Sequence, residues 1–259
     1  MTDRSKLTYR LRHALRHPDR VRPYLARLTR DIWLRLHARD HVSYYRAVMR
    51  SDAARSPEAA VGSASHERWL ALGKMQFDYL VDHGLKPGDR VLEIGCGNLR
   101  AGWRLIEYLD AGHFYGVDIS PDILTSAQET IARFGLQDKL PHLTPVRDLT
   151  LSFLPAGYFT VVHAHSVFSH SPVEVIDECL ARIGRVMEAD GFFDFTFDRT
   201  DGEEHHVLRE DFYYRTDTLI RLAEGHGLEA RLMNDWECLP HRQSKIRVTL
   251  PTGTARPGA

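Results

Sequence analysis

The stretch Val91-Leu92-Glu93-Ile94-Gly95-Cys96-Gly97-Asn98 decides the fold class of this chain. Its apolar first half is typical of a buried β-strand, and the glycines after it permit a sharp turn that opens a helix near Leu99. Because Gly95 and Gly97 carry no side chain, this turn can bring backbone amide groups close to a bound molecule. The stretch therefore predicts a strand, a ligand-binding turn and a helix, in that order.

The position of the next glycine argues against a nicotinamide dinucleotide. The dinucleotide fingerprint has a third glycine where the helix meets the pyrophosphate, which would be position 100. This chain has Arg100 there, and its next glycine is Gly102. The same spacing argues against a phosphate-binding P-loop.

Short apolar runs alternate with helical patterns around this stretch. A helix is expected over residues 67–81, with His83-Gly84 as its stop signal. Strands are expected at residues 90–94, 113–117, 143–146, 159–164, 191–197, 229–235 and 245–250. Such alternation predicts a parallel sheet with helices on both faces. We therefore expect an α/β fold with a doubly wound, mostly parallel seven-stranded sheet whose last strand is antiparallel, plus an N-terminal helical extension.

The N-terminal extension is strongly basic. Residues 1–50 contain thirteen Lys and Arg against four Asp, a formal charge of +9 in a chain whose net charge is −1. Apolar residues recur there at spacings of three and four, which predicts amphipathic helices broken near Pro18 and Pro23. The stripe comprises Leu7, Leu11, Ala14, Leu15, Val21, Leu25, Leu28, Ile32 and Leu36. It can pack on the body as a lid, support a homodimer, or face nucleic acid or an anionic membrane surface.

The chain is expected to divide into three parts. Residues 1–65 form the basic arm and a linker rich in Ala, Ser, Gly and Pro, residues 66–250 form the main domain, and residues 251–259 form a disordered tail. No apolar run is long enough for a transmembrane helix, and no signal peptide is evident, so a cytoplasmic protein is expected. Cys96, Cys179 and Cys238 lack CxxC spacing, which predicts neither disulfides nor a zinc site.

An acidic residue ends the second expected strand. Asp118 lies 23 residues after Gly95, where one carboxylate can accept hydrogen bonds from both hydroxyls of a ribose. Together with the ExGxG pattern at Glu93–Gly97 and Asp148 after the third strand, Asp118 completes a pattern that resembles the motifs of class I S-adenosylmethionine-dependent methyltransferases. The resemblance covers residues 67–250.

The resemblance implies S-adenosylmethionine as the cofactor, S-adenosylhomocysteine as its product, and a role for each motif. The glycine turn would lie beneath the methionine part, with Arg100 near its carboxylate, whereas Asp118 and Ile119 would hold the ribose. Asp148 and Leu149 would contact the adenine, although Asp148 can also simply cap a turn. The residues assigned to the glycine turn are Glu93, Gly95, Cys96, Gly97 and Asn98.

Three histidines in eight residues follow the fourth strand, in His163-Ala164-His165-Ser166-Val167-Phe168-Ser169-His170. Methyl transfer to a hydroxyl needs an oriented nucleophile and removal of its proton, for which an imidazole near neutral pKa is appropriate. His165 is the first choice as general base and His170 the second, whereas His163 is expected to point into the sheet packing. His165 can alternatively shape the cofactor pocket.

The acceptor is expected to be a small polyhydroxylated molecule. The Asn/Asp-Pro-Pro-aromatic tetrapeptide of amino-group methylation is missing, and the SVFSH segment resembles bacterial methyltransferases of sugars and other small molecules. Residues 198–211 form an acidic loop that can hydrogen-bond such an acceptor or remain a solvated surface. His205 and His206 would point apart in an extended segment, so no metal site is predicted. The rings of Phe212, Tyr213 and Tyr214 are expected in the packing of the next helix, or stacked on a sugar.

Three classes of function therefore remain open. The first and favoured class is a small-molecule O-methyltransferase acting on a saccharide hydroxyl. The second is an RNA or protein methyltransferase that docks its polymer on the basic arm, for which salt-sensitive binding would be diagnostic. The arm's apolar stripe argues against nucleic acid. The third class is a binding module that retains the cofactor pocket without turnover.

Overall fold

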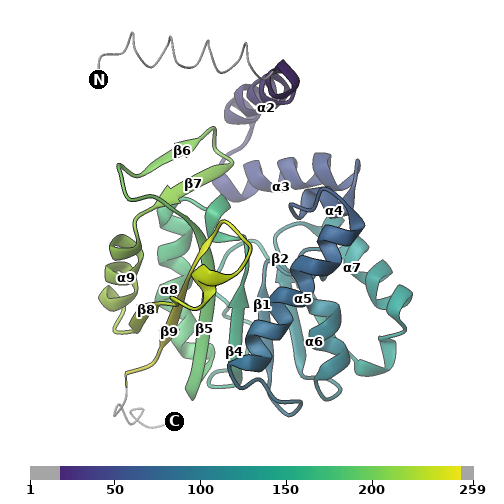
Figure 1. The fold of residues 1–259 in the computed structure, drawn as a ribbon, viewed down its shortest axis with the longest axis vertical. Coiled ribbons are helices and arrows are strands. Elements are labelled where there is room, and N and C mark those ends of the chain that lie inside the picture. The colour runs from purple at the N-terminus through teal and green to yellow at the C-terminus, as the bar shows by residue number, and fades with distance from the viewer. Residues whose placement is uncertain (1–17, 252–259) are drawn as a thin grey trace.

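A nine-stranded sheet, seven strands of which make its main layer, forms the centre of the computed structural model, which describes residues 18–251 (Figure 1). In the main layer the strand order is β3-β2-β1-β4-β5-β9-β8, and within this layer β9 runs antiparallel to the other six strands. The strands are β1 (Val91–Ile94), β2 (Phe114–Asp118), β3 (His142–Pro145), β4 (Phe159–Ala164), β5 (Met187–Arg199), β8 (Glu229–Leu232) and β9 (Ser244–Thr249). The predicted fold class is confirmed.

Helices cover both faces of this sheet because successive strand residues point to opposite sides. Val91 and Val161 pack with α5, α6 and α7, whereas the adjacent Leu92 and Val162 pack with α8 and α9. The helices are α5 (His66–Asp82), α6 (Gly102–Tyr108), α7 (Pro121–Phe134), α8 (Val173–Val186) and α9 (Thr216–Gly225). Short 3-10 turns are η1 (Gln137–Lys139), η2 (Phe168–His170) and η3 (Trp236–Cys238).

Local capping signals fix where α5 begins and ends. The Ser65 side chain accepts a hydrogen bond from the backbone N–H of Arg68, and the helix closes at His83 before Gly84, whose φ is +95°. The predicted stop at His83-Gly84 is confirmed. The turn that follows leads directly into β1 and so places the glycine turn at the carboxyl edge of the sheet.

A small hairpin occupies the segment expected as a loop, and this expectation is wrong. β6 (His205–Val207) pairs with β7 (Asp211–Tyr214), and β7 pairs in parallel with Asp198 and Arg199 at the end of β5. The aromatic residues of this segment therefore lie on a strand, and Phe212 and Tyr214 pack in the same core as Leu219 of the next helix, as expected. The hairpin forms because β5 extends past the end of β9 and offers free backbone groups to β7.

The N-terminal arm consists of α2 (Pro18–His37), α3 (His41–Ala53) and α4 (Pro57–Ala60). The expected break near Pro23 is wrong, because α2 continues through this position; a proline removes one helical hydrogen bond there without ending the helix. α3 and α4 fill much of the expected linker at residues 51–65. Leu7, Leu11, Ala14 and Leu15 of the apolar stripe and the expected tail beyond Pro251 lie outside the described residues. A homodimer through the arm stays a prediction.

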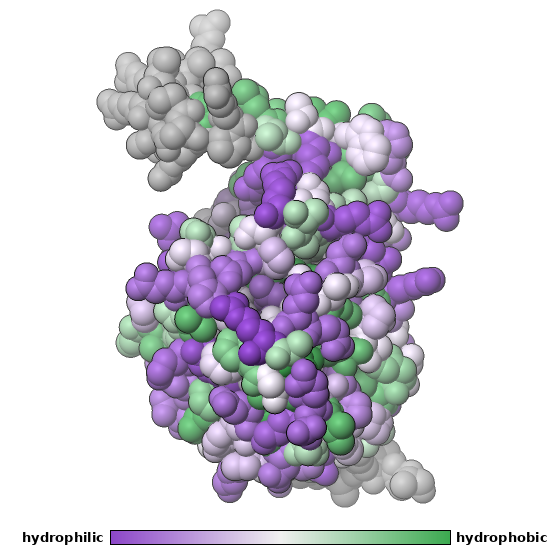
Figure 2. Space-filling view, turned by 90° about the vertical axis from the view of Figure 1, so that its right-hand side faces the viewer, coloured by the Kyte–Doolittle hydropathy of each residue, from purple (hydrophilic) through white to green (hydrophobic). Residues whose placement is uncertain are grey.

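The surface of the body mixes polar and apolar side chains. Figure 2 shows hydrophilic side chains over most of one face, with hydrophobic ones in small separate groups. Among residues 18–251, no helix is long and apolar enough to cross a membrane.

Candidate functional site

The glycine turn after β1 is closely covered by two side chains. Gly95 and Gly97 have φ values of +66° and +54°, which favour glycine. A Cβ atom on Gly95 would lie 2.4 Å from Cγ2 of Val167, and one on Gly97 would lie 2.8 Å from Cγ1 of Val61. The turn therefore requires glycine at both positions, because the backbone has a positive φ and because a Cβ atom would collide with Val167 or Val61.

Asp118 joins the glycine turn to the end of β2. Its carboxylate accepts hydrogen bonds from the backbone N–H of Gly97 at 3.0 Å and of Ser120 at 2.8 Å. Burial raises the pKa of Asp118 to about 6, although these amide hydrogen bonds oppose the shift. The buried carboxylate faces a cavity of about 760 Å³ that the glycine turn also lines.

One end of the cavity contains buried polar groups without partners. Glu93 Oε2, Arg100 Nε and Gln76 Nε2 have no hydrogen-bond partner among the described residues. Burial raises the pKa of Glu93 to about 8, against the opposing effect of Arg100, and burial lowers the pKa of Arg100 to about 10. Arg68 also lines this end. Unpartnered buried polar atoms are costly, so this end of the cavity is equipped to hydrogen-bond a polar ligand.

Asn98 does not reach the cavity, unlike its neighbours Cys96 and Gly97. Its Nδ2 donates to the carbonyl of Pro57 at 3.2 Å, and its Oδ1 accepts from Nε1 of Trp69 at 2.9 Å. Asn98 instead holds α4 and α5 against the glycine turn. The sequence predicted that this side chain contacts the cofactor, but in the structure it does not line the cavity.

The other end of the cavity is mostly apolar. Ile119 and Leu149 line it, and Arg46 of α3 donates to the carbonyl oxygens of Ile119 and Val146 at 2.7 and 3.1 Å. Asp148 also lines the cavity, but its Oδ1 accepts from the backbone N–H and the hydroxyl of Thr150. Asp148 thus caps a turn, the alternative role left open by the sequence.

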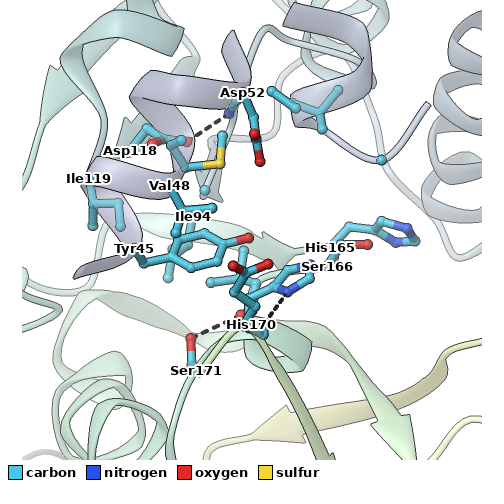
Figure 3. A pocket seen from close by; sticks show the side chains of 18 of the residues that line it. Tyr45, Val48, Asp52, Ile94, Asp118, Ile119, His165, Ser166, His170 and Ser171 are labelled. Atoms are coloured by element: carbon cyan, nitrogen blue, oxygen red, sulfur yellow. Dashed lines mark hydrogen bonds between the residues drawn. The ribbon is translucent and has the colours of Figure 1, made fainter. Parts of the chain in front are cut away.

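Helix α3 covers the cavity, and sequence reasoning did not identify its residues as part of the site. Tyr45, Val48 and Asp52 line the cavity beside Ile94 and Asp118 (Figure 3). The Tyr45 ring stacks on His170 with centroids 5.3 Å apart. Helix α3 therefore packs on the body over the cavity, whereas Leu25, Ile32 and Leu36 of the predicted apolar stripe in α2 are exposed. The apolar stripe identified in the sequence ends at Leu36 and does not include these positions.

The structure separates the three histidines that the sequence grouped. His163 is fully buried in β4, and burial lowers its pKa well below the ordinary value, as it does for His165. The His165 ring lies 5.6 Å from Trp236 in an edge-on arrangement and points away from His170 (Figure 3). Both His165 and His170 line the cavity, whereas His163 points into the sheet packing as expected.

His170 is held by hydrogen bonds at one ring nitrogen. Its Nδ1 lies 2.6 Å from the backbone carbonyl oxygen of Glu210 and 3.5 Å from Oδ1 of Asp211. Burial alone would lower the pKa of His170, but these contacts outweigh it and raise the pKa above the ordinary value. Because a carbonyl oxygen only accepts, the neutral ring carries its proton on Nδ1 and has a lone pair on Nε2.

The acidic segment after β5 divides into two groups. Asp198, Glu210 and Asp211 line the cavity, whereas the other charged members lie off it: Asp201, Glu203, Glu204, His205 and His206. His205 stacks on Tyr213 at 4.6 Å, so this ring faces its own hairpin. Within the part of the chain that the structure describes, no three His, Cys, Asp or Glu side chains converge as metal ligands.

Comparison with known proteins agrees with this geometry. Residues 92–193 match the family model of a methyltransferase domain. The fold is similar to that of magnesium protoporphyrin IX methyltransferase (ChlM) from Synechocystis PCC 6803 with bound SAM, with 16% identity, a TM-score of 0.60, and coverage of 83% of this chain and 99% of that one.

Two further solved structures share the fold. A TehB-like SAM-dependent methyltransferase from Corynebacterium glutamicum is 20% identical, with a TM-score of 0.53 and coverage of 79% of this chain and 99% of that one. The [4+2]-cyclase SpnF is 14% identical, with a TM-score of 0.55 and coverage of 69% and 82%. Residues 92–193 thus match a methyltransferase domain, in a chain whose Rossmann-like α/β fold these solved structures share.

Proposed function

We propose that this chain transfers a methyl group from S-adenosylmethionine to a hydroxyl of a small polar acceptor, with His170 as general base. One observation supports this proposal most directly. His170 has a fixed Nδ1 donor and lines the same cavity as Asp118 and the glycine turn. The groups that can bind the cofactor and a proton acceptor therefore line one cavity.

The residues present fit the cofactor. Gly95 and Gly97 leave room for close approach of a ligand to the backbone, and the Asp118 carboxylate can accept from ribose hydroxyls. The unpartnered atoms of Glu93 and Arg100 provide an acceptor for an amino group and a donor for a carboxylate. S-adenosylmethionine would supply a methyl group on a sulfonium, and the domain match and the SAM-bound structural neighbours support it as the cofactor.

The environment of the histidines favours His170 over His165 as the base. His165 is held neutral by burial and has no fixed donor at Nδ1, which has no partner among the described residues. His170 can remove the acceptor proton at Nε2 while the new imidazolium is stabilised by Asp211 at 3.5 Å. The order of preference inferred from the sequence is thus reversed in this proposal, and His165 keeps the alternative role of shaping the cofactor pocket.

Polar groups near His170 support a polyhydroxylated acceptor, with a saccharide as the preferred class. Asp198, Ser166 and Gln243 line this part of the cavity, and the Tyr45 ring offers an aromatic face. The Tyr45 side chain lines the cavity, so its hydroxyl can bind an acceptor hydroxyl. Fold similarity does not choose the acceptor, since the similar structures include a porphyrin methyltransferase and a cyclase.

The arm's contacts disfavour the alternative of polymer docking. Arg27, Arg30 and Arg46 bind carboxylates or carbonyls of the same chain, so their charges are engaged within the molecule. A polymer methyltransferase would show RNA or protein binding that weakens steeply with salt.

The proposal is tested by methylation assays with S-adenosylmethionine and a panel of monosaccharides, glycosides and phenols, followed by product mass spectrometry. We expect a gain of one methyl on a saccharide oxygen. Cofactor binding with no turnover on any of these acceptors or on RNA would instead indicate a binding module.

A further inference from the structure

Two arginines of α2 contact the segment that holds His170. Arg27 donates from Nε to Glu210 Oε2 at 2.7 Å and from Nη2 to Asp211 Oδ2 at 2.6 Å. Arg30 donates from Nη2 to Glu210 Oε1 at 2.9 Å and from Nη1 to Asp52 Oδ1 at 2.7 Å. Both oxygens of the Glu210 carboxylate are therefore bound by the arm.

Glu210 and Asp211 are also the two residues that contact Nδ1 of His170. The arginine contacts are made to their side chains, whereas His170 uses the backbone carbonyl of Glu210 and the other carboxylate oxygen of Asp211. Glu210 is only 5% exposed, so its charge needs these partners. The arm thus fixes the position of the atoms that orient the imidazole.

We propose that Arg27 and Arg30 are positioning residues for His170, so that the basic arm completes the catalytic site. This inference rests on the proposed function for its catalytic meaning, but the contact itself is independent of turnover. The positive charge of the arm then serves the orientation of the base rather than the docking of a polymer.

Other groups also face His170. Asp198 of β5 lies near the ring and contributes to its raised pKa, and the backbone carbonyl of His170 is bonded to Nε2 of His41 from α3 at 2.8 Å. Tyr45 stacks on the ring. These contacts come from β5 and α3 and not from α2, although Arg30 also binds Asp52 of α3, the helix that carries His41 and Tyr45.

Arg30 is the better residue to replace. Arg27 bonds directly to Asp211, so its loss would change the charge beside His170 as well as the position of Glu210. Among the described residues, Arg30 bonds to Glu210 and Asp52 only. Loss of a cation by itself would raise the pKa of His170, whereas loss of the Glu210 and Asp211 contacts would lower it. The two effects have opposite signs and can be told apart.

The test is NMR titration of the His170 ring in the full-length protein and in Arg30→Met and Arg30→Lys, with the signal assigned by its loss in His170→Gln. Arg50→Met is the control, because it removes an equal charge from an exposed arm ion pair with Asp122. We expect Arg30→Met to lower the His170 pKa by about 0.5–1 unit, Arg30→Lys to restore part of the shift, and Arg50→Met to have no effect.

S-adenosylhomocysteine titration of each variant shows whether the cofactor pocket is intact, and an unchanged affinity is expected. An unchanged or raised His170 pKa in Arg30→Met would overturn the positioning role. If Arg30→Met does not fold, the His170 pKa is compared between Arg30→Lys and Arg50→Lys instead. A lower pKa in Arg30→Lys than in Arg50→Lys then supports the positioning role, and equal values contradict it. Full turnover in His170→Gln would refute the proposed base and leave the pKa result standing as evidence for the contact alone.

Discussion

The backbone carbonyl oxygen of Glu210 lies 2.6 Å from Nδ1 of His170, and this contact fixes which ring nitrogen carries the proton. With Nδ1 as the donor, the lone pair of the neutral ring is on Nε2. His170 also lies against Tyr45 and lines the cavity. The His170 ring is thus held in place at Nδ1, whereas Nε2 is available to accept a proton.

Replacement of His170 by Gln should abolish most turnover without weakening cofactor binding. A general base contributes about 100-fold or more to the rate, so kcat should fall by at least that factor. His165→Gln is the matched control, for which we expect a loss of less than about 10-fold. Methyl transfer rates and S-adenosylhomocysteine titration measure the two effects. A larger loss of turnover in His165→Gln than in His170→Gln would return the role of base to His165.

The pH dependence of kcat should follow the titration of His170. The base works when neutral, so kcat should rise with pH through a pKa above the ordinary value of about 6.5. Asp211→Asn removes a carboxylate that raises this pKa, so the acid limb should move to lower pH. Rates at saturating acceptor measured from about pH 5 to about pH 9 test this. An acid limb that moves to higher pH in Asp211→Asn would contradict the assignment.

Asp118 should give cofactor binding its own pH dependence. Burial raises the pKa of Asp118 to about 6, and its charged form is the better acceptor for ribose hydroxyls. Affinity for S-adenosylhomocysteine should therefore fall as the pH drops below this value. Asp118→Asn should cost about 1.5–3 kcal/mol of binding free energy at neutral pH and remove the pH dependence. Calorimetric titration at several pH values measures both, and unchanged affinity at neutral pH would mean that this carboxylate does not bind the ligand.

Gly95→Ala should destabilise the fold more than Gly135→Ala, although both positions have positive φ. Their φ values are +66° and +65°, so the backbone cost of about 1 kcal/mol is shared. Only Gly95 has a neighbour in the way, Val167, whereas nothing lies within 4 Å of a Cβ on Gly135. Crowding should add about 1–3 kcal/mol at Gly95. Denaturant unfolding gives the difference, and Gly95→Ala with Val167→Ala should recover part of it. Equal destabilisation by Gly95→Ala and Gly135→Ala would show that the glycine turn can accommodate a Cβ atom at Gly95 beside Val167.

The sequence predicted those parts of the structure that depend on short patterns. Gly95, Gly97 and Asp118 belong to one strand-turn-helix unit and the next strand, and the parallel pairing of β1 with β2 places them together. The stop of α5 at His83-Gly84 is likewise a local signal. These features need no knowledge of distant parts of the chain.

The parts that could not be predicted depend on contacts between distant segments. Tyr45 enters the site because Arg46 binds carbonyls more than seventy residues away, at Ile119 and Val146. The β6–β7 hairpin depends on pairing with the free end of β5. Asn98 is turned from the cavity by Pro57 and Trp69. Hydrophobic spacing shows that a face is buried but not which surface covers it.

The most direct test of the central claim is calorimetric titration of the full-length protein with S-adenosylhomocysteine and, in parallel, with NAD. We expect saturable binding of S-adenosylhomocysteine with a dissociation constant in the micromolar range and no binding of NAD. Binding of NAD, or no binding of S-adenosylhomocysteine, would contradict the assignment of this cavity to S-adenosylmethionine.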